Sequence, residues 1–121
     1  MKRDWDVIRD VLLEVEELSA DDRRRFSYSE SDGRADAARV EHALLLWRGG
    51  FIKAIDAGST GGAALLCPDL TWQGHDLLDT LRSKPVWERI KSTAKEKGIE
   101  LTFDAVKALG QMALDYVLTG G

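Results

Sequence analysis

Apolar residues recur every three to four positions over most of the chain, which is the spacing that buries one side of a helix. The pattern predicts helices over about residues 4–18, 35–48, 72–82, 85–97 and 103–118. Several of these helices are bounded by residues that favour helix ends, namely Thr71 and Thr102 as N-caps and Gly49 and Gly98 as terminators. In the helix over 35–48 we expect a buried stripe formed by Val40, Ala43, Leu44 and Trp47.

Two short apolar runs, 51–55 and 63–67, flank a glycine-rich segment over 58–62. Apolar runs around such a segment are typical of a β-hairpin, and we expect Pro68 to end its second strand. Large and small side chains alternate over 26–29, which predicts one more short strand.

The predicted order is helix, short strand, helix, hairpin and then three helices. A helix that ends in glycine before a two-stranded hairpin is the arrangement of the winged helix-turn-helix. We therefore predict a mainly α protein with a small β-hairpin, in which a winged helix-turn-helix-like core is followed by additional C-terminal helices. A single domain would cover residues 1–121, with the core over about 1–82 and the helical extension over about 83–118.

The composition is that of an ordinary globular protein, with 44% hydrophobic and 31% charged residues among 121. Because Cys67 is the one cysteine, an internal disulfide is impossible, and we expect a reducing, cytoplasmic setting. No apolar run approaches the roughly 20 residues that a membrane span needs, and the charged N-terminus does not resemble a signal peptide. We therefore expect no membrane association.

Basic residues that would contact double-stranded DNA in such a fold stand on the predicted recognition helix, on the hairpin and in one basic cluster before the short strand. The candidates are Arg23, Arg24, Arg25, Arg34, Arg39 and Lys53. Asp36 lies three residues before Arg39, so an intrahelical ion pair is the alternative role of that arginine. The net charge of −4 also argues against DNA, because neutralisation of phosphates supplies most non-specific affinity.

His75 is the residue that most invites a chemical role, since it follows Gly74 and stands near Asp76 and Asp79. A histidine beside carboxylates suits a general base or a metal ligand, but no nucleophile and no further ligands accompany it at suitable spacing. We favour a structural role in which Gly74 permits tight packing of helix on hairpin and His75 hydrogen-bonds to the backbone. We predict no enzyme activity, no catalytic residue, no metal and no cofactor.

The last predicted helix has a wide apolar face, and terminal helices of this kind often dock on a second copy. We predict a homodimer, with the candidate interface residues Phe103, Val106, Met112 and Tyr116. Packing of this helix on the first helix is an equally good alternative. Gly110 in its middle would permit the close approach of another helix.

Four segments of the chain carry a resemblance to a known family. They are MKRDWDVIR (1–9), LTWQGHDLLD (70–79), PVWERIK (85–91) and LTFDAVK (101–107). Over nearly its whole length the chain resembles the phage- and prophage-associated family catalogued as domain of unknown function 2513. The resemblance implies a winged-helix-like fold and no particular activity, because the family is uncharacterised.

Two functions remain open at this point. The first is a phage or prophage regulator that binds double-stranded DNA as a dimer, with the helix over 35–48 in the major groove. The alternative is a protein-interaction module or inhibitor that binds a host or phage protein through an acidic surface without binding DNA. The net charge and the acidic end of the first helix, with Glu14, Glu16 and Glu17, favour the alternative. The predicted fold and the family resemblance favour the DNA-binding regulator, which is the function we prefer from the sequence.

Overall fold

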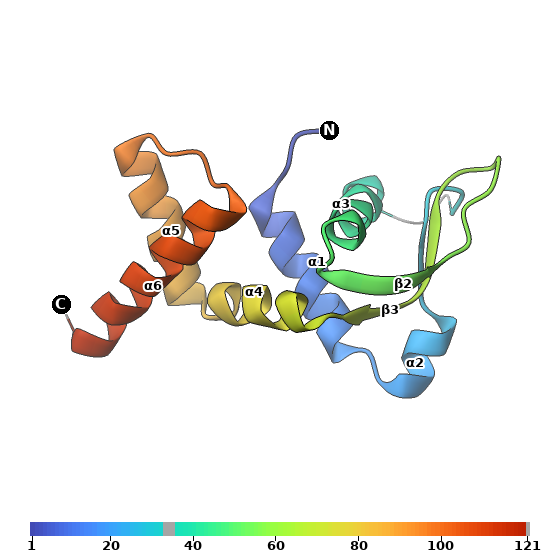
Figure 1. Cartoon of the computed structure of the whole chain (residues 1–121), viewed down its shortest axis with the longest axis horizontal. Helices are drawn as coiled ribbons and strands as arrows, with labels where there is room; N and C mark the ends of the chain where they lie inside the picture. The colour runs from blue at the N-terminus through green and yellow to red at the C-terminus, as the bar shows by residue number, and fades with distance from the viewer. Residues whose placement is uncertain (33–35, 121) are drawn as a thin grey trace. The chain divides into compact units, whose positions relative to one another are not determined.

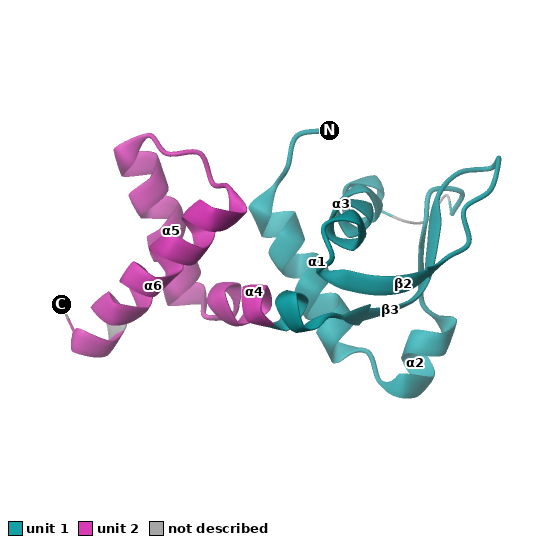
Figure 2. Cartoon of the chain, viewed as in Figure 1, with its two compact units in different colours: residues 1–75 teal, residues 76–121 magenta. Residues whose placement is uncertain are grey.

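A computed structural model describes residues 1–32 and 36–120 of the chain (Figure 1). The chain divides into two compact units, residues 1–75 and 76–121 (Figure 2). The boundary falls inside α4 (Trp72–Arg82), which contributes residues to both units. The single domain, with its core ending near residue 82, stays a prediction.

The first unit combines helices with a small antiparallel sheet. Its elements before α4 are α1 (Trp5–Glu17), α2 (Ala20–Arg25), β1 (Ser27–Ser29), α3 (Ala37–Arg48), β2 (Ile52–Asp56) and β3 (Ala64–Leu70). The strand order is β1-β3-β2, so the predicted hairpin is confirmed and the predicted short strand pairs with its second strand. The fold class is thereby confirmed as mainly helical with a small sheet, in an arrangement compatible with a winged-helix-like core followed by C-terminal helices.

Short side chains cap the helices of this unit as their chemistry dictates. The Asp4 carboxylate accepts a hydrogen bond of 2.9 Å from the backbone N–H of Asp6 at the start of α1. The Ser19 hydroxyl accepts one of 3.1 Å from the backbone N–H of Asp22, and this cap starts the six-residue α2. Because β1 separates α2 from α3, the two helices do not follow one another as a helix-turn-helix pair does.

The strand β3 continues through Pro68, so the prediction that Pro68 ends the strand is wrong. Its pairing with β2 shifts register between Lys53 and Ile55, which marks a β-bulge at Cys67 and Pro68. Cys67 has a φ of 54° there, in the left-handed region. A proline is tolerated at this place because a bulge does not require its missing N–H.

The core of the first unit lies between the sheet and the helices α1 and α3. α1 contacts both α3 and β3, and it buries Trp5, Ile8, Val11, Leu12 and Val15. From the sheet, Tyr28, Ile52, Leu65, Pro68 and Leu70 are buried. The stripe predicted for α3 needs one correction, because Leu46 is buried whereas Trp47 is only half-buried. The close packing predicted at Gly74 is confirmed, since a Cβ there would collide with the backbone carbonyl oxygen of Phe51.

The second unit contains the end of α4 together with α5 (Lys84–Lys97) and α6 (Phe103–Thr119). Ser83 caps α5, Pro85 stands in its first turn, and Gly98 ends it with a φ of 66°, as the sequence predicts. Gly110 of α6 lies so close to Thr80 of α4 that a Cβ would collide with the threonine methyl group. The predicted close approach of another helix is therefore confirmed. None of the helices described is long and apolar enough to cross a membrane.

Candidate interaction surfaces

Arg39 of α3 is surrounded by carboxylates. Its guanidinium lies 3.3 Å from Glu14 Oε2, 3.9 Å from Asp36 Oδ2 and 4.0 Å from Asp10 Oδ2. The pair with Asp36 is the one that the sequence predicts, whereas the other two carboxylates come from α1. Three anions around one half-exposed cation leave little positive potential for a phosphate.

Glu14 also fixes the buried ring of Tyr28. The Tyr28 hydroxyl donates a hydrogen bond of 2.6 Å to Glu14 Oε1. Burial raises the pKa of Tyr28 well above its ordinary value, and the hydrogen bond to Glu14 and its negative charge raise the pKa further. The acidic end of α1 is thus used in part to connect α1 to β1 and α3.

Beside this cluster the first unit has an open hollow of about 460 Å³, which we call the acidic hollow. Three carboxylates and one guanidinium line it, together with the half-buried apolar side chains of two leucines and a phenylalanine. The lining residues are Asp10, Leu13, Glu14, Glu17, Leu18, Phe26 and Arg39. The hollow therefore combines an apolar surface with an excess of negative charge.

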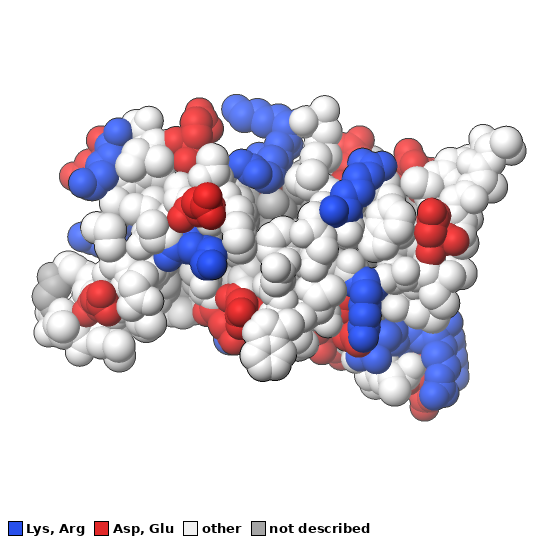
Figure 3. Space-filling model, viewed as in Figure 1, with Lys and Arg blue, Asp and Glu red and all other residues white. Residues whose placement is uncertain are grey.

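Two of the predicted basic candidates meet at one aspartate of β3. The guanidinium of Arg23 lies 3.6 Å from Asp69 Oδ1, and the Lys53 ammonium lies 3.9 Å from Asp69 Oδ2. Arg24 pairs with Asp21 at 2.9 Å on α2 itself, and Arg25 is exposed. Figure 3 shows basic side chains gathered over α2 with acidic ones among them. The structure thus brings Arg23 and Lys53 together, whereas Arg39 lies among other carboxylates.

The remaining parts of the predicted DNA interface, Arg34 and the loop between β2 and β3, give no further support for DNA binding. Arg34 lies outside the described residues. The loop between β2 and β3 has no basic residue over 57–63, and two carboxylates bind its backbone. Asp56 accepts from the N–H of Gly58 at 2.9 Å, and Glu30 accepts from the N–H of Ala63 at 2.8 Å. A wing of this composition repels phosphate rather than attracting it.

The histidine that is buried and hydrogen-bonded to the backbone is not His75, as the sequence predicts, but His42. His75 is exposed, and it is His42 that is buried with a partner on each ring nitrogen. Nδ1 lies 2.7 Å from the carbonyl oxygen of Ala38, and Nε2 accepts a hydrogen bond of 2.8 Å from the backbone N–H of Asp4. His42 is therefore a structural residue, and the sequence gives no signal of this role, because its partner Asp4 is 38 positions away in the chain.

The residues predicted for a dimer interface are divided by the structure between core and surface. Val106 is fully buried within the second unit, Phe103 is half-buried, and Met112 and Tyr116 are exposed. The guanidinium of Arg89 lies 4.2 Å from the centre of the Tyr116 ring and covers part of it. The homodimer itself stays a prediction.

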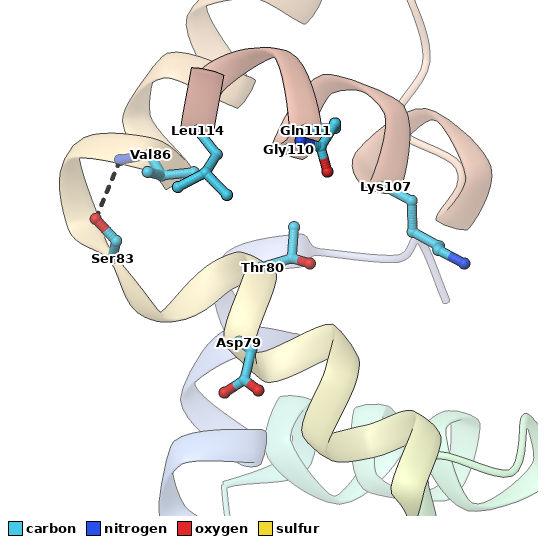
Figure 4. A pocket seen from close by; sticks show the side chains of 8 residues that line it. All are labelled: Asp79, Thr80, Ser83, Val86, Lys107, Gly110, Gln111 and Leu114. Carbon is cyan, nitrogen blue, oxygen red and sulfur yellow. Dashed lines mark hydrogen bonds between the residues drawn. The ribbon is translucent and has the colours of Figure 1, made fainter. Parts of the chain in front are cut away.

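A pocket of about 320 Å³ opens in the second unit (Figure 4). Its lining residues are Asp79, Thr80, Ser83, Val86, Lys107, Gly110, Gln111 and Leu114. Asp79 is paired with Arg82 at 3.2 Å, and the Ser83 hydroxyl accepts a hydrogen bond from the N–H of Val86, so neither is poised as a base or a nucleophile. Among the described residues, no group of three or more His, Cys, Asp or Glu side chains could hold a metal ion.

Several surface residues were not predicted from the sequence. Asp69 joins Arg23 to Lys53, although it is distant from Arg23 in the chain. Ile55 and Leu66 are exposed on neighbouring strands, and Trp72, which the sequence placed at a helix start, is 84% exposed. Only the position of Trp72 gave a signal, because the first residue of a helix has few neighbours on its own helix.

The fold and these surfaces define a small, mainly helical protein with a first unit compatible with a winged-helix-like core. The chain belongs to the family described as hypothetical protein DUF2513, whose model matches residues 2–100. It is 39% identical over 119 residues to an uncharacterised protein of Haemophilus influenzae, an alignment that covers 98% of this chain and 99% of that protein. No solved structure matches the chain. The predicted family is confirmed, whereas its association with phages stays a prediction.

Proposed function

We propose that this protein is a non-enzymatic protein-interaction module, and that its acidic hollow binds a basic segment of a partner protein. The observation that carries the proposal is the lining of the hollow, in which three carboxylates and one arginine surround apolar side chains. A partner's arginine or lysine has a long aliphatic stem and a cationic end, so it matches both parts of this lining.

The individual residues of the hollow differ in how free they are to bind. Glu14 is engaged by Tyr28 and Arg39, and Asp10 is 4.0 Å from Arg39. Glu17 is exposed at the end of α1, where a carboxylate is unfavourable for the helix dipole. Asp10 and Glu17 are therefore the carboxylates that we expect a cationic partner to contact.

A regulator that binds double-stranded DNA is the second candidate. The arrangement of the first unit and the meeting of Arg23 with Lys53 favour it. The neutralised Arg39 and the acidic surroundings of the β2–β3 loop weigh against it. The two candidates differ in the sign of the charge that the protein attracts, which makes them separable by experiment.

The test uses two probes, a short peptide of alternating arginine and leucine and a random DNA duplex. We expect the peptide to shift the NMR amide signals of residues 10–18 and the duplex to leave fluorescence anisotropy unchanged at low salt. Glu17→Lys should weaken peptide binding by about fivefold, whereas Glu96→Lys on the exposed surface of α5 should not change it.

Each alternative outcome overturns a specific statement. Equal peptide affinity in Glu17→Lys and Glu96→Lys would remove the acidic hollow as the site. Binding of the duplex that weakens steeply with salt would replace the proposal with the DNA-binding candidate. An unchanged midpoint of urea unfolding confirms that each variant is folded.

A further inference from the structure

The outer face of the sheet in the first unit exposes two aliphatic side chains side by side. Ile55 of β2 is directly opposite Leu66 of β3 in the antiparallel register, so the two side chains lie on the same face. Ile55 is 59% exposed and Leu66 is 37% exposed. The two adjacent side chains form a small apolar patch that a partner protein could cover.

Cations border this apolar pair. Lys53 lies two residues before Ile55 on the same strand, and its partner in the register is Asp69. Arg23 reaches the same carboxylate from α2, which packs against β3. Asp69 is thus shared by two cations at 3.6 and 3.9 Å, so positive charge exceeds negative charge at this point.

The pairing of Arg23 is also incomplete. Its Nε atom is buried and has no hydrogen-bond partner in the described part of the chain. Among residues 1–32 and 36–120, the long contact to Asp69 is the one that holds the guanidinium. A carboxylate from outside would add charge-assisted hydrogen bonds to the exposed part of this guanidinium and to the Lys53 ammonium.

We propose that this surface, formed by Arg23, Lys53, Ile55 and Leu66 and named here the sheet face, binds an acidic segment of a protein partner that carries aliphatic side chains. The proposal goes beyond the acidic hollow and uses none of its residues. The complementarity is of two kinds, because leucine-type side chains would cover Ile55 and Leu66 while carboxylates would meet Lys53 and Arg23.

A protein segment fits the sheet face better than a nucleic acid does. Nucleic-acid surfaces use aromatic side chains on which bases stack, and the exposed centre here is aliphatic. They also neutralise several phosphates in a row, whereas Arg23 and Lys53 share Asp69 and so provide only a small excess of positive charge, which suits a short acidic segment.

The test is an NMR titration of the full chain with a short peptide of alternating glutamate and leucine. We expect amide shifts over β2 and β3, and about tenfold weaker binding in Lys53→Glu. Ile55→Ser should weaken binding severalfold without changing the salt dependence, because it removes apolar contact area only. Lys97→Glu, an exposed lysine at the end of α5, is the matched control and should bind as the parent does.

The outcomes separate this proposal from the acidic hollow. If Lys53→Glu binds the glutamate–leucine peptide as tightly as Lys97→Glu does, the sheet face is not its site. Shifts of β2 and β3 with a single-stranded oligothymidylate in place of the peptide would assign the face to nucleic acid and overturn the proposal. Glu17→Lys should leave binding of this peptide unchanged, so failure at the acidic hollow does not affect the result.

Discussion

The backbone N–H of Asp4, the residue that caps α1, donates a hydrogen bond of 2.8 Å to Nε2 of the buried His42 in α3. Since the carbonyl of Ala38 can only accept, Nδ1 must carry the proton, and the ring is the neutral tautomer protonated at Nδ1. One imidazole thus connects the start of α1 to the first turns of α3.

We expect His42→Ala to lower the free energy of unfolding by about 2 kcal/mol. The substitution removes the hydrogen-bond acceptor of the Asp4 N–H and leaves a cavity where the imidazole ring was buried. Urea unfolding followed by circular dichroism measures the change. His75→Ala removes the exposed histidine and should stay within about 0.5 kcal/mol of the parent. Equal losses in both variants would contradict the structural role of His42.

Tyr28 makes stability depend on pH at the alkaline end. Its pKa is raised in the folded protein by burial and by Glu14, so the folded state keeps a proton that the unfolded state releases near pH 10.0. The contribution is therefore fully present below that pH and is lost as the pH rises above it, by up to about 1.4 kcal/mol per pH unit.

We expect Tyr28→Phe to lack this alkaline loss, whereas Tyr116→Phe, which changes an exposed tyrosine, should retain it. Urea unfolding at about pH 9 and about pH 11 provides the comparison. An alkaline loss of the same size in Tyr28→Phe would show that other groups cause it.

Gly110 of α6 and Thr80 of α4 should be thermodynamically coupled, since a Cβ at Gly110 collides with the Thr80 methyl group. Alanine would gain about 1 kcal/mol of helix propensity, but we expect the collision to exceed this gain and Gly110→Ala to be destabilising. Serine at position 80 removes the methyl group, so Thr80→Ser should recover stability in the Gly110→Ala background. A double-mutant cycle measures the coupling, and strictly additive effects would contradict the contact.

Cys67 has a left-handed backbone that favours glycine. We expect Cys67→Gly to be at least as stable as the parent, because relief of about 1 kcal/mol of strain offsets the lost side-chain contacts. Cys67→Val should be destabilising, since a β-branched residue is disfavoured at this φ. Thermal unfolding of the two variants decides the point, and a less stable glycine variant would be evidence against strain.

The sequence predicted the longer helices well, because their ends are set by local chemistry, but it did not predict the six-residue α2, whose sequence has no apolar stripe. Thr71, Ser83 and Thr102 bond to backbone N–H groups one turn later, and Gly98 adopts the left-handed backbone that ends α5. These effects act within a few residues, so they can be inferred without knowledge of the rest of the fold.

The surfaces were predicted less well because they depend on residues that are distant in the chain. The partner of Arg39 that lies nearest, Glu14, is 25 positions away, and the sequence offers no rule that selects it over other carboxylates. The same holds for Asp69 with Arg23. Charge pairs of this kind follow from the packing of elements, so a basic residue that is counted as a DNA contact can be neutralised in the fold.

The bulge in β3 has a consequence for comparing this chain with its relatives. Cys67 and Pro68 stand opposite the single residue Ala54, so the inward-facing positions change from odd to even numbers along the strand. A deletion of Cys67 would leave Pro68 alone opposite Ala54 and restore one-to-one pairing, so Leu70 would still face the core and Asp69 would still face solvent. A homologue that is one residue shorter at this place can therefore keep the same core residues on both sides of the gap, whereas a gap placed anywhere else in the strand would reverse the faces of the residues between the gap and the bulge.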